Sequence, residues 1–466
     1  MTEQLLDLIK KEYAAASGAA PMAPGMEYYA HLAMLRDWWR GKYAPFHEHR
    51  ESCAGAPPVR RELYRMGMAK TVCEDWATVL INDRTRLYIE DAALSAHLLG
   101  TRDCMGGYLT GGSFWSRLNA FVEESFALGM GGVFTGTVLG ESGAHLPLHF
   151  VSAEWIVPLA SSDGEITACA FLGAGGIATT AKGGKGKGRR ARAYDTETEA
   201  TAVLFFPKEN GYITRYLAIS KKGDVRVMHE AETAYKPFAT FSPNIVSPDA
   251  SRAFFGGGVS VFEGAIDNLK GIDLAYNNFC RDLYLGGKKV FLNQSLTQSD
   301  AYGNRVAPDD VAQQLFLTVG DTDLSSDTMI FEHNPDLRAE ENARAVQAQL
   351  DYLSFKVGFG ARRYCFSDAR VVTATQYAGE KQAFLQHAMK HYIRVEMFLR
   401  ALVDMAAEGE VDGVSVDFDD SFFIDPTAER ERDLREVQLG LLLPWEYRVK
   451  YYGESAAEAK AALGAQ

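Results

Sequence analysis

The segment FEGAIDNLKGIDLAYNNFCRDLY (residues 262–284) places apolar side chains at steps of three and four residues. This period predicts an amphipathic helix about 35 Å long. The adjacent glycines at 286 and 287 are expected to end it and to lead into a strand. The positions expected to pack along this helix are Phe262, Ile266, Leu269, Tyr276 and Leu283.

The residues that follow predict two more long helices. The second is expected over 334–356, with Asn334 as N-cap, Pro335 at the first helical position and acids in the first turn. Residues 285–333 between the two helices have the pattern of a small mixed unit of strands and polar loops. A loop over 357–375 precedes a third helix that runs to about residue 408.

The regions that flank these long helices differ in their residue patterns. Residues 1–125 are expected to be mainly helical, whereas residues 132–240 hold short β-branched and aromatic runs separated by turns such as SSDG (161–164) and KENG (208–211). A strand GVSVDFDD (413–420) and a helix from Pro426, interrupted at Pro444, end the sequence. The predicted fold class is therefore α+β, with an antiparallel sheet.

The composition is that of a globular protein. Of the 466 residues 47% are hydrophobic, and the net charge is −13, which argues against non-specific nucleic-acid binding by the whole surface. This charge is compatible with DNA sliding past the protein. The six cysteines include no CxxC pair, so we interpret them as reduced thiols of a cytoplasmic protein. The sequence shows no signal peptide and no apolar run of membrane-spanning length.

Three motifs invite a catalytic interpretation. KGGKGKGRRAR (182–192) lacks the Ser or Thr of a phosphate loop and is interpreted as a hairpin tip, with a phosphate-backbone contact as the alternative. His387 and His391 lack the glutamate of a zinc-protease helix. Asp417, Asp419 and Asp420 could bind Mg²⁺ in a DNA-processing enzyme, but are better explained as a strand end before a helix cap. No catalytic residue, metal or cofactor is predicted.

Three long segments carry a resemblance to a known family. They are FEGAIDNLKGIDLAYNNF (262–279), VGFGARRYCFSDARVVTATQYAGEKQAF (357–384) and DFDDSFFIDPTAERERDLREVQLGLLLPWEYRVKYYGE (417–454). The chain resembles the portal proteins of tailed double-stranded-DNA phages, in the branch found in long-tailed siphophages of Gram-positive bacteria and their prophages. The similarity covers roughly residues 30–455.

The resemblance implies a division of the chain into named parts. The portal fold would comprise a wing of helices and antiparallel sheet, a two-helix stem, a small α/β clip, a tunnel loop and a helical C-terminal crown. The corresponding ranges are wing 1–258, stem helix 259–284, clip 285–333, stem helix 334–356, tunnel loop 357–375, second part of the wing 376–425, and crown 426–466.

The resemblance also implies a function. Twelve copies would form a ring at one capsid vertex, through which double-stranded DNA is packaged and ejected without sequence preference. The terminase large subunit, the head–tail adaptor, the major capsid protein and the scaffolding protein would be partners, and no membrane is involved. The protein would be assembled in the host cytoplasm, reside in the virion and have no enzyme activity.

The tunnel loop supplies the candidate DNA contacts. Lys356, Arg362, Arg363 and Arg370 are the cations expected to touch DNA, with salt bridges to neighbouring subunits as the alternative. Glycine accepts the backbone angles that a moving loop visits, so Gly358 and Gly360 are expected to act as hinges. A ring also requires two different apolar faces on each subunit, and the stem helices are expected to provide them.

Overall fold

The computed structural model confirms an α+β fold. It describes the chain except for residues 53–56, 83, 103–104, 110–112, 136–147, 174–197, 249–255, 288, 294–297, 300–304, 307–315, 320–329, 361, 367–373, 419–425, 453–455 and 465–466. Side chains are also left undescribed at 101–102, 105–106, 198–199, 292–293, 298–299, 305–306, 316–319, 330, 374–383, 426–429, 456–458 and 464.

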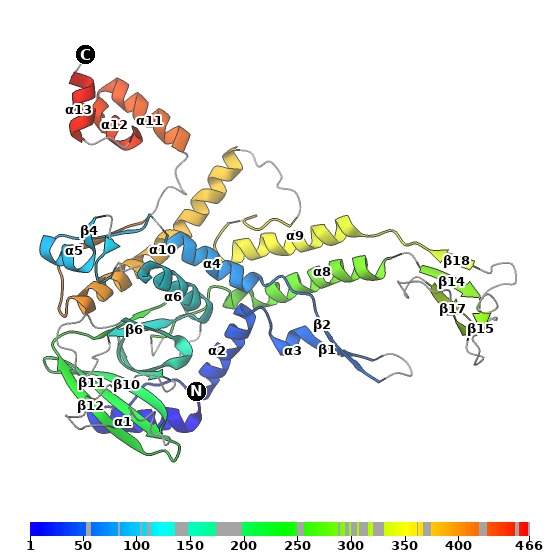
Figure 1. The fold of residues 1–466 in the computed structure, drawn as a ribbon, viewed down its shortest axis with the longest axis horizontal. Helices are drawn as coiled ribbons and strands as arrows, with labels where there is room; N and C mark the ends of the chain where they lie inside the picture. Colours follow the sequence, from blue (N-terminus) through cyan, green and yellow to red (C-terminus); the bar gives the residue numbers. More distant parts are fainter. Residues whose placement is uncertain are drawn as a thin grey trace, which may run out of the picture.

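The first 130 residues are largely helical, as expected. The helices are α1 (Glu3–Ser17), α2 (Met26–Trp39), α3 (Ala44–His47), α4 (Met68–Leu80), α5 (Ala92–Leu98) and α6 (Phe114–Leu128). Short strands that the helical pattern did not predict lie between them: β1 (Glu48–Glu51), β2 (Val59–Glu62), β3 (Arg86–Ile89), β4 (Gly100–Arg102) and β5 (Met105–Gly106). Strands β1 and β2 pair as an antiparallel hairpin that extends from the body (Figure 1).

Antiparallel strands follow, as the short β-rich runs predicted, but they form two sheets where one was expected. Strands β8 (Ile156–Ser162), β9 (Glu165–Gly173), β10 (Thr198–Lys208), β11 (Gly211–Ser220) and β12 (Val225–Thr233) form one sheet in the order β12-β11-β10-β9-β8. Strands β6 (Gly131–Thr135), β7 (Leu148–Ser152) and β13 (Phe238–Phe241) form the other, in the order β13-β6-β7, and the 3₁₀ turn Ala153–Trp155 joins β7 to β8.

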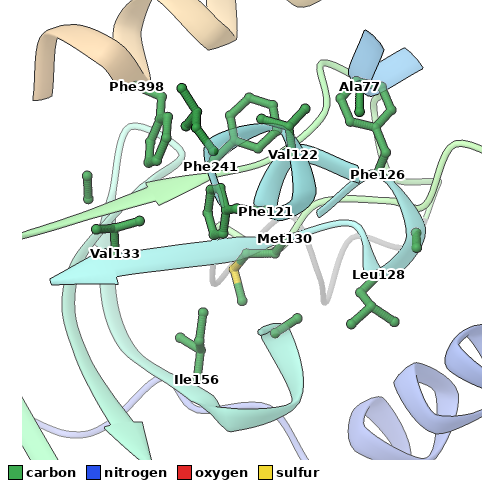
Figure 2. Packing of buried hydrophobic residues seen from close by; sticks show 14 of the residues in the cluster. Ala77, Phe121, Val122, Phe126, Leu128, Met130, Val133, Ile156, Phe241 and Phe398 are labelled. Carbon is green, nitrogen blue, oxygen red and sulfur yellow. The ribbon is translucent and has the colours of Figure 1, made fainter. Parts of the chain in front are cut away.

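The main hydrophobic core lies where α6 meets this smaller sheet and the last long helix, α10 (Ala374–Ala406). The Phe121 ring of α6 stacks on Phe398 of α10 at 5.3 Å, and Phe241 of β13 lies 5.5 Å from Phe398 (Figure 2). Gly132 of β6 lets the Phe171 ring of β9 pack close to the smaller sheet, because a Cβ at position 132 would lie 2.5 Å from that ring. Segments far apart in sequence therefore share one core.

Two long helices leave this body side by side. They are α8 (Ile266–Leu285), preceded by a 3₁₀ turn (Glu263–Ala265), and α9 (Ala339–Lys356). Strands β14 (Lys289–Asn293), β17 (Phe316–Val319) and β18 (Ile330–His333) form a small sheet at their far end, and β15 (Gln298–Ser299) pairs with β16 (Arg305–Val306) (Figure 1). Strand β17 runs parallel to β14, and β18 runs antiparallel to it.

The sequence prediction for the start of the second helix was wrong. Helix α9 begins at Ala339 with Arg338 as its N-cap, so Asn334 and Pro335 precede the helix by several residues. The chain uses residues 334–338 to cross from β18 to the helix, and Arg338 is held there by Asp282 of α8 at 2.9 Å. The local Asn-Pro signal is therefore overridden where the chain crosses from β18 to α9.

The C-terminal elements agree with the prediction. Strand β19 (Val414–Asp417) pairs with β3, and the helices α11 (Pro426–Leu439) and α12 (Pro444–Tyr452) start at the two prolines. Helix α13 (Ala456–Gly464) follows. These three helices form a separate group that stands apart from the body (Figure 1). Among the described residues, no helix has both the length and the apolar character needed to cross a membrane.

Candidate functional site

The two-helix rod formed by α8 and α9 is the most distinctive part of the molecule. Leu269 and Ile272 of α8 are buried, as are Val346 and Leu350 of α9. The helices approach most closely at Gly271, where a Cβ would lie 2.8 Å from the amide oxygen of Gln349. The two helices of the rod therefore pack closely through an interface that is partly apolar and partly polar.

Polar bonds clamp both ends of the rod. Near the body, the Asn268 amide donates to the side-chain oxygen of Gln349 at 2.8 Å. Near the strands, Asp282 accepts bonds from Arg338 and Asn342. These two bonds hold the pKa of the Asp282 carboxyl below its usual value. The rod therefore stays paired along its length.

A second polar seam fastens the rod to the segment that contains the β1–β2 hairpin. Asp273, Asn277 and Arg281 lie four residues apart, so they follow one face of α8. Asp273 accepts from His47 at 3.0 Å and from the Met66 amide at 2.8 Å. Asn277 accepts from the Tyr64 amide, and Arg281 donates to Glu51. His47, Glu51, Tyr64 and Met66 are thus held on the rod by hydrogen bonds and ion pairs.

The expected packing positions on α8 have different environments. Phe262 is fully buried just before the helix, and Leu269 is buried within it. Ile266 and Tyr276 are half-buried, and the Tyr276 ring lies 6.2 Å from Phe366. Leu283 is 45% exposed. Four of the five positions therefore contact the chain's own core, and Leu283 faces outward.

Exposed apolar side chains gather on the rod and on α10. On α9, Tyr352 is 51% and Phe355 67% exposed. On α10, three residues at four-residue spacing are about half exposed: Met389, Ile393 and Met397. The opposite face of α10 is buried in the core at Val395, Phe398, Leu399 and Leu402. Two of the exposed apolar groups on the chain are therefore the rod face (Tyr352, Phe355) and the α10 face (Met389, Ile393, Met397).

The start of the expected tunnel loop is anchored. Val357 and Phe359 are buried, and the carbonyl of Val357 accepts a bond from the Trp76 indole at 3.0 Å. The Phe359 ring stacks on Trp76 at 4.6 Å. Gly358 and Gly360 have φ values of 89° and 78°, a region that favours glycine. Both glycines therefore form a tight turn in the described conformation.

The following residues run back along α9. The Gln347 side chain donates to the carbonyl of Tyr364 at 2.9 Å and accepts from the amide of Phe366 at 2.8 Å. The Phe366 ring packs edge-on against Phe279 of α8 at 5.3 Å. Burial raises the pKa of the Tyr364 hydroxyl, which remains protonated at neutral pH. Residues 357–360 and 362–366 are thus part of the packed structure.

The candidate cations occupy different positions. Lys356 donates to the carbonyl of Gly264 at 2.9 Å, and Arg363 pairs with Asp75 at 3.4 Å over the ring of Phe359. Arg362 is exposed and, among the described residues, makes no ion pair. Arg370 lies outside the described residues. Of the four candidate cations, Arg362 is thus the described one that is exposed and makes no ion pair within the described residues.

Of the motifs weighed for catalysis, His387, His391 and Asp417 lie within the described residues. His391 is buried, and its Nδ1 accepts from the Asn244 amide at 3.1 Å, whereas His387 is exposed. Burial lowers the pKa of His391 to about 3, so its ring is neutral. Asp417 lies in β19, whereas Asp419, Asp420 and the glycine-rich run 182–192 lie outside the described residues. The described part of the chain contains no group of three metal-ligating side chains.

Two of the solved structures that resemble this chain come from a gene transfer agent particle. One is described as the virion of a native gene transfer agent particle: it is 14% identical, with 95% of this chain and 98% of that chain covered, at a TM-score of 0.41. The other, the neck of a native gene transfer agent particle computed with C12 symmetry, is 13% identical over 82% of this chain and 88% of that chain, at a TM-score of 0.38. No protein-family model matches the chain, and no curated protein matches it. Both TM-scores are below 0.5, so the case for a function rests on the residues and geometry of this chain.

Proposed function

We propose that this protein is a structural component of a phage-like particle, a portal protein that forms a ring around a DNA channel. The observation that carries the proposal is the pair of separate apolar surfaces on one chain, the rod face and the α10 face. A closed ring is built from head-to-tail contacts, in which one surface of each copy meets a different surface of the next. Two unlike apolar surfaces satisfy that requirement, and the family resemblance suggests twelve copies.

The rod supports the same proposal. Its paired helices lift the small sheet of β14, β17 and β18 away from the body (Figure 1). In a ring, twelve such rods would line a channel and present the sheets at one end. We assign residues 259–284 and 334–356 to the stem, 285–333 to the clip, and the remaining ranges to wing, tunnel loop and crown as the resemblance implies. The clip is the proposed docking site for the terminase large subunit and the head–tail adaptor.

The charge of the chain suits a channel for DNA. At a net charge of −13 per copy, a ring repels the phosphate backbone broadly, which limits adhesion. Arg362 is the proposed transient contact, because it is exposed and its charge is not used by an ion pair in the described residues. Lys356 and Arg363 already bind the chain's own groups, so they are weaker candidates.

Electron microscopy of the purified full chain tests the ring. We expect rings with a central channel for the wild type and for Val246→Asp, which adds a charge at a side chain 89% exposed in the loop after β13. Ile393→Asp adds the same charge in the α10 face and is expected to abolish the rings. Wild-type protein that forms no rings at any concentration would overturn the proposal, as would rings that Ile393→Asp leaves intact.

The channel function is tested in assembled particles. Particles made with the wild-type chain should protect DNA from added nuclease, and particles assembled without it should protect none. Equal protection in both would contradict the channel function. Mg²⁺-dependent nicking of DNA by the purified chain, lost on Asp417→Ala, would instead favour the DNA-processing alternative.

A further inference from the structure

The three C-terminal helices are held together in an unusual way. Among their described side chains, Ala459 is the only fully buried apolar one, and Val437, Leu442, Trp445 and Val449 are half-buried. Several leucines point outward, with exposed fractions of 74% at Leu439, 76% at Leu441 and 51% at Leu443. The largest apolar surface of this unit is therefore on its outside.

Polar contacts hold the unit together. Asp433 is buried and accepts from the Lys450 ammonium and the Tyr451 hydroxyl, each at 2.7 Å. These bonds lower the pKa of the Asp433 carboxyl. The Lys460 ammonium lies 4.2 Å from the centroid of the Trp445 ring. Helices of 14, 9 and 9 residues are marginal without a packed apolar core.

No other described element covers these leucines. Within the described residues, α11, α12 and α13 make their substantial contacts only with one another. They also form a group that stands apart from the body (Figure 1). A second molecule is therefore a candidate occupant of the leucine surface.

The charge pattern favours a second copy of the same unit. Two whole chains repel each other at −13 each, but residues 430–452 carry five cations and four anions. The charged residues are Arg430, Glu431, Arg432, Asp433, Arg435, Glu436, Glu446, Arg448 and Lys450. A nearly neutral surface with both signs interspersed is complementary to its own copy, whereas a strongly acidic or basic partner would favour one sign.

We propose that α11–α13 complete their core only against the same unit of a neighbouring copy, with Leu439, Leu441 and Leu443 at the contact. This inference rests on the proposed ring, and it adds that the C-terminal helices become stable only on assembly. Burying three leucine side chains supplies the apolar area that the isolated unit lacks. The stability of the C-terminal helices would then depend on whether the neighbouring copies of the ring are in place.

Hydrogen exchange of the full chain tests this, with the oligomeric state of each sample measured first by native mass. Amides of residues 431–442 should exchange at least about tenfold more slowly in the ring than in the monomer. The variant Leu439→Ser/Leu441→Ser should still form rings through the rod and α10 faces, but with monomer-like exchange at 431–442. Val246→Ser serves as the control and should keep the wild-type protection.

The outcomes separate this inference from the proposed function. Slow exchange of residues 431–442 in both monomer and ring would mean that the unit folds alone and would overturn the inference. Fast exchange of these residues in both would also overturn the inference, while the proposed ring would stand. Smaller oligomers in which the amides of residues 431–442 exchange slowly would support the C-terminal contact and overturn the ring. A chain that stays monomeric at every concentration would overturn both.

Discussion

Replacing Asp273 by alanine should detach the segment 47–66 from the rod. Asp273 is buried in α8, and its two oxygens accept from His47 at 3.0 Å and from the Met66 amide at 2.8 Å. Alanine leaves both donors without a partner, and His47 is fully buried. A buried group that loses its partner costs about 1–3 kcal/mol, so the two together cost about 2–6 kcal/mol. Even the lower bound, about 2 kcal/mol, corresponds to a roughly thirtyfold larger equilibrium constant for detachment of this segment.

Hydrogen exchange of residues 47–66 measures this directly, and it avoids assuming that the whole chain unfolds in one step. Asp273→Ala should accelerate exchange there at least about thirtyfold. Asp273→Asn keeps an acceptor for the Met66 amide and should have a smaller effect. The matched control is Asp267→Ala on the same helix, because the Asp267 side chain is 96% exposed and bonds to Lys270 at the surface. Equal exchange in Asp273→Ala and Asp267→Ala would refute the polar seam.

Three further predictions concern the core around the loop. Burial lowers the pKa of His391 to about 3 from 6.5, so stability present above pH 6.5 should be lost as the pH falls toward 3. His391→Phe should flatten that part of the pH profile of unfolding, and an unchanged slope would contradict the assignment. Trp76→Phe removes the donor to the Val357 carbonyl and should cost about 1–3 kcal/mol, seen as faster exchange at 357–366 but not at 47–66. Gly358→Ala forces a side chain into φ 89° beside His387 and should lower the unfolding temperature by an amount equivalent to about 1–2 kcal/mol; an unaltered midpoint would show that the turn is not fixed.

The long helices were predictable because their packing is periodic. The 3.6-residue pattern located α8 and α10 to within a few residues at each end, and the prolines at 426 and 444 marked the starts of α11 and α12. The start of α9 was missed, because residues 334–338 connect β18 to the helix and the local Asn-Pro pattern carries no signal for that tertiary path.

Buried polar contacts were the main feature hidden from the sequence. Asp273 and Asn277 look like solvent-facing positions of an amphipathic helix, yet both are buried against residues 47–66. Periodicity reports apolar faces and carries no signal for a polar residue that finds a buried partner far away in the chain. The β1–β2 hairpin was missed for a different reason: its strands are short and charged, so they lack the alternating apolar pattern of a strand.

The candidate site was only partly readable from the sequence. Glycine spacing suggested hinges at Gly358 and Gly360, but the burial of Phe359 against Trp76 is a tertiary fact that the spacing could not reveal. The exposed stripe of α10, which includes Ile393, was likewise hidden, because the helix has apolar residues on two faces and only packing shows which one meets the core.

The mass of the assembled protein tests the central claim most directly. Native mass measurement of the purified full chain over a range of concentrations should show a dominant species of about twelve copies of the 51.3 kDa chain. Ile393→Asp should shift that species to monomer, while Val246→Asp should not. A wild-type chain that stays a 51.3 kDa monomer at every concentration would contradict the account of a ring-forming portal protein.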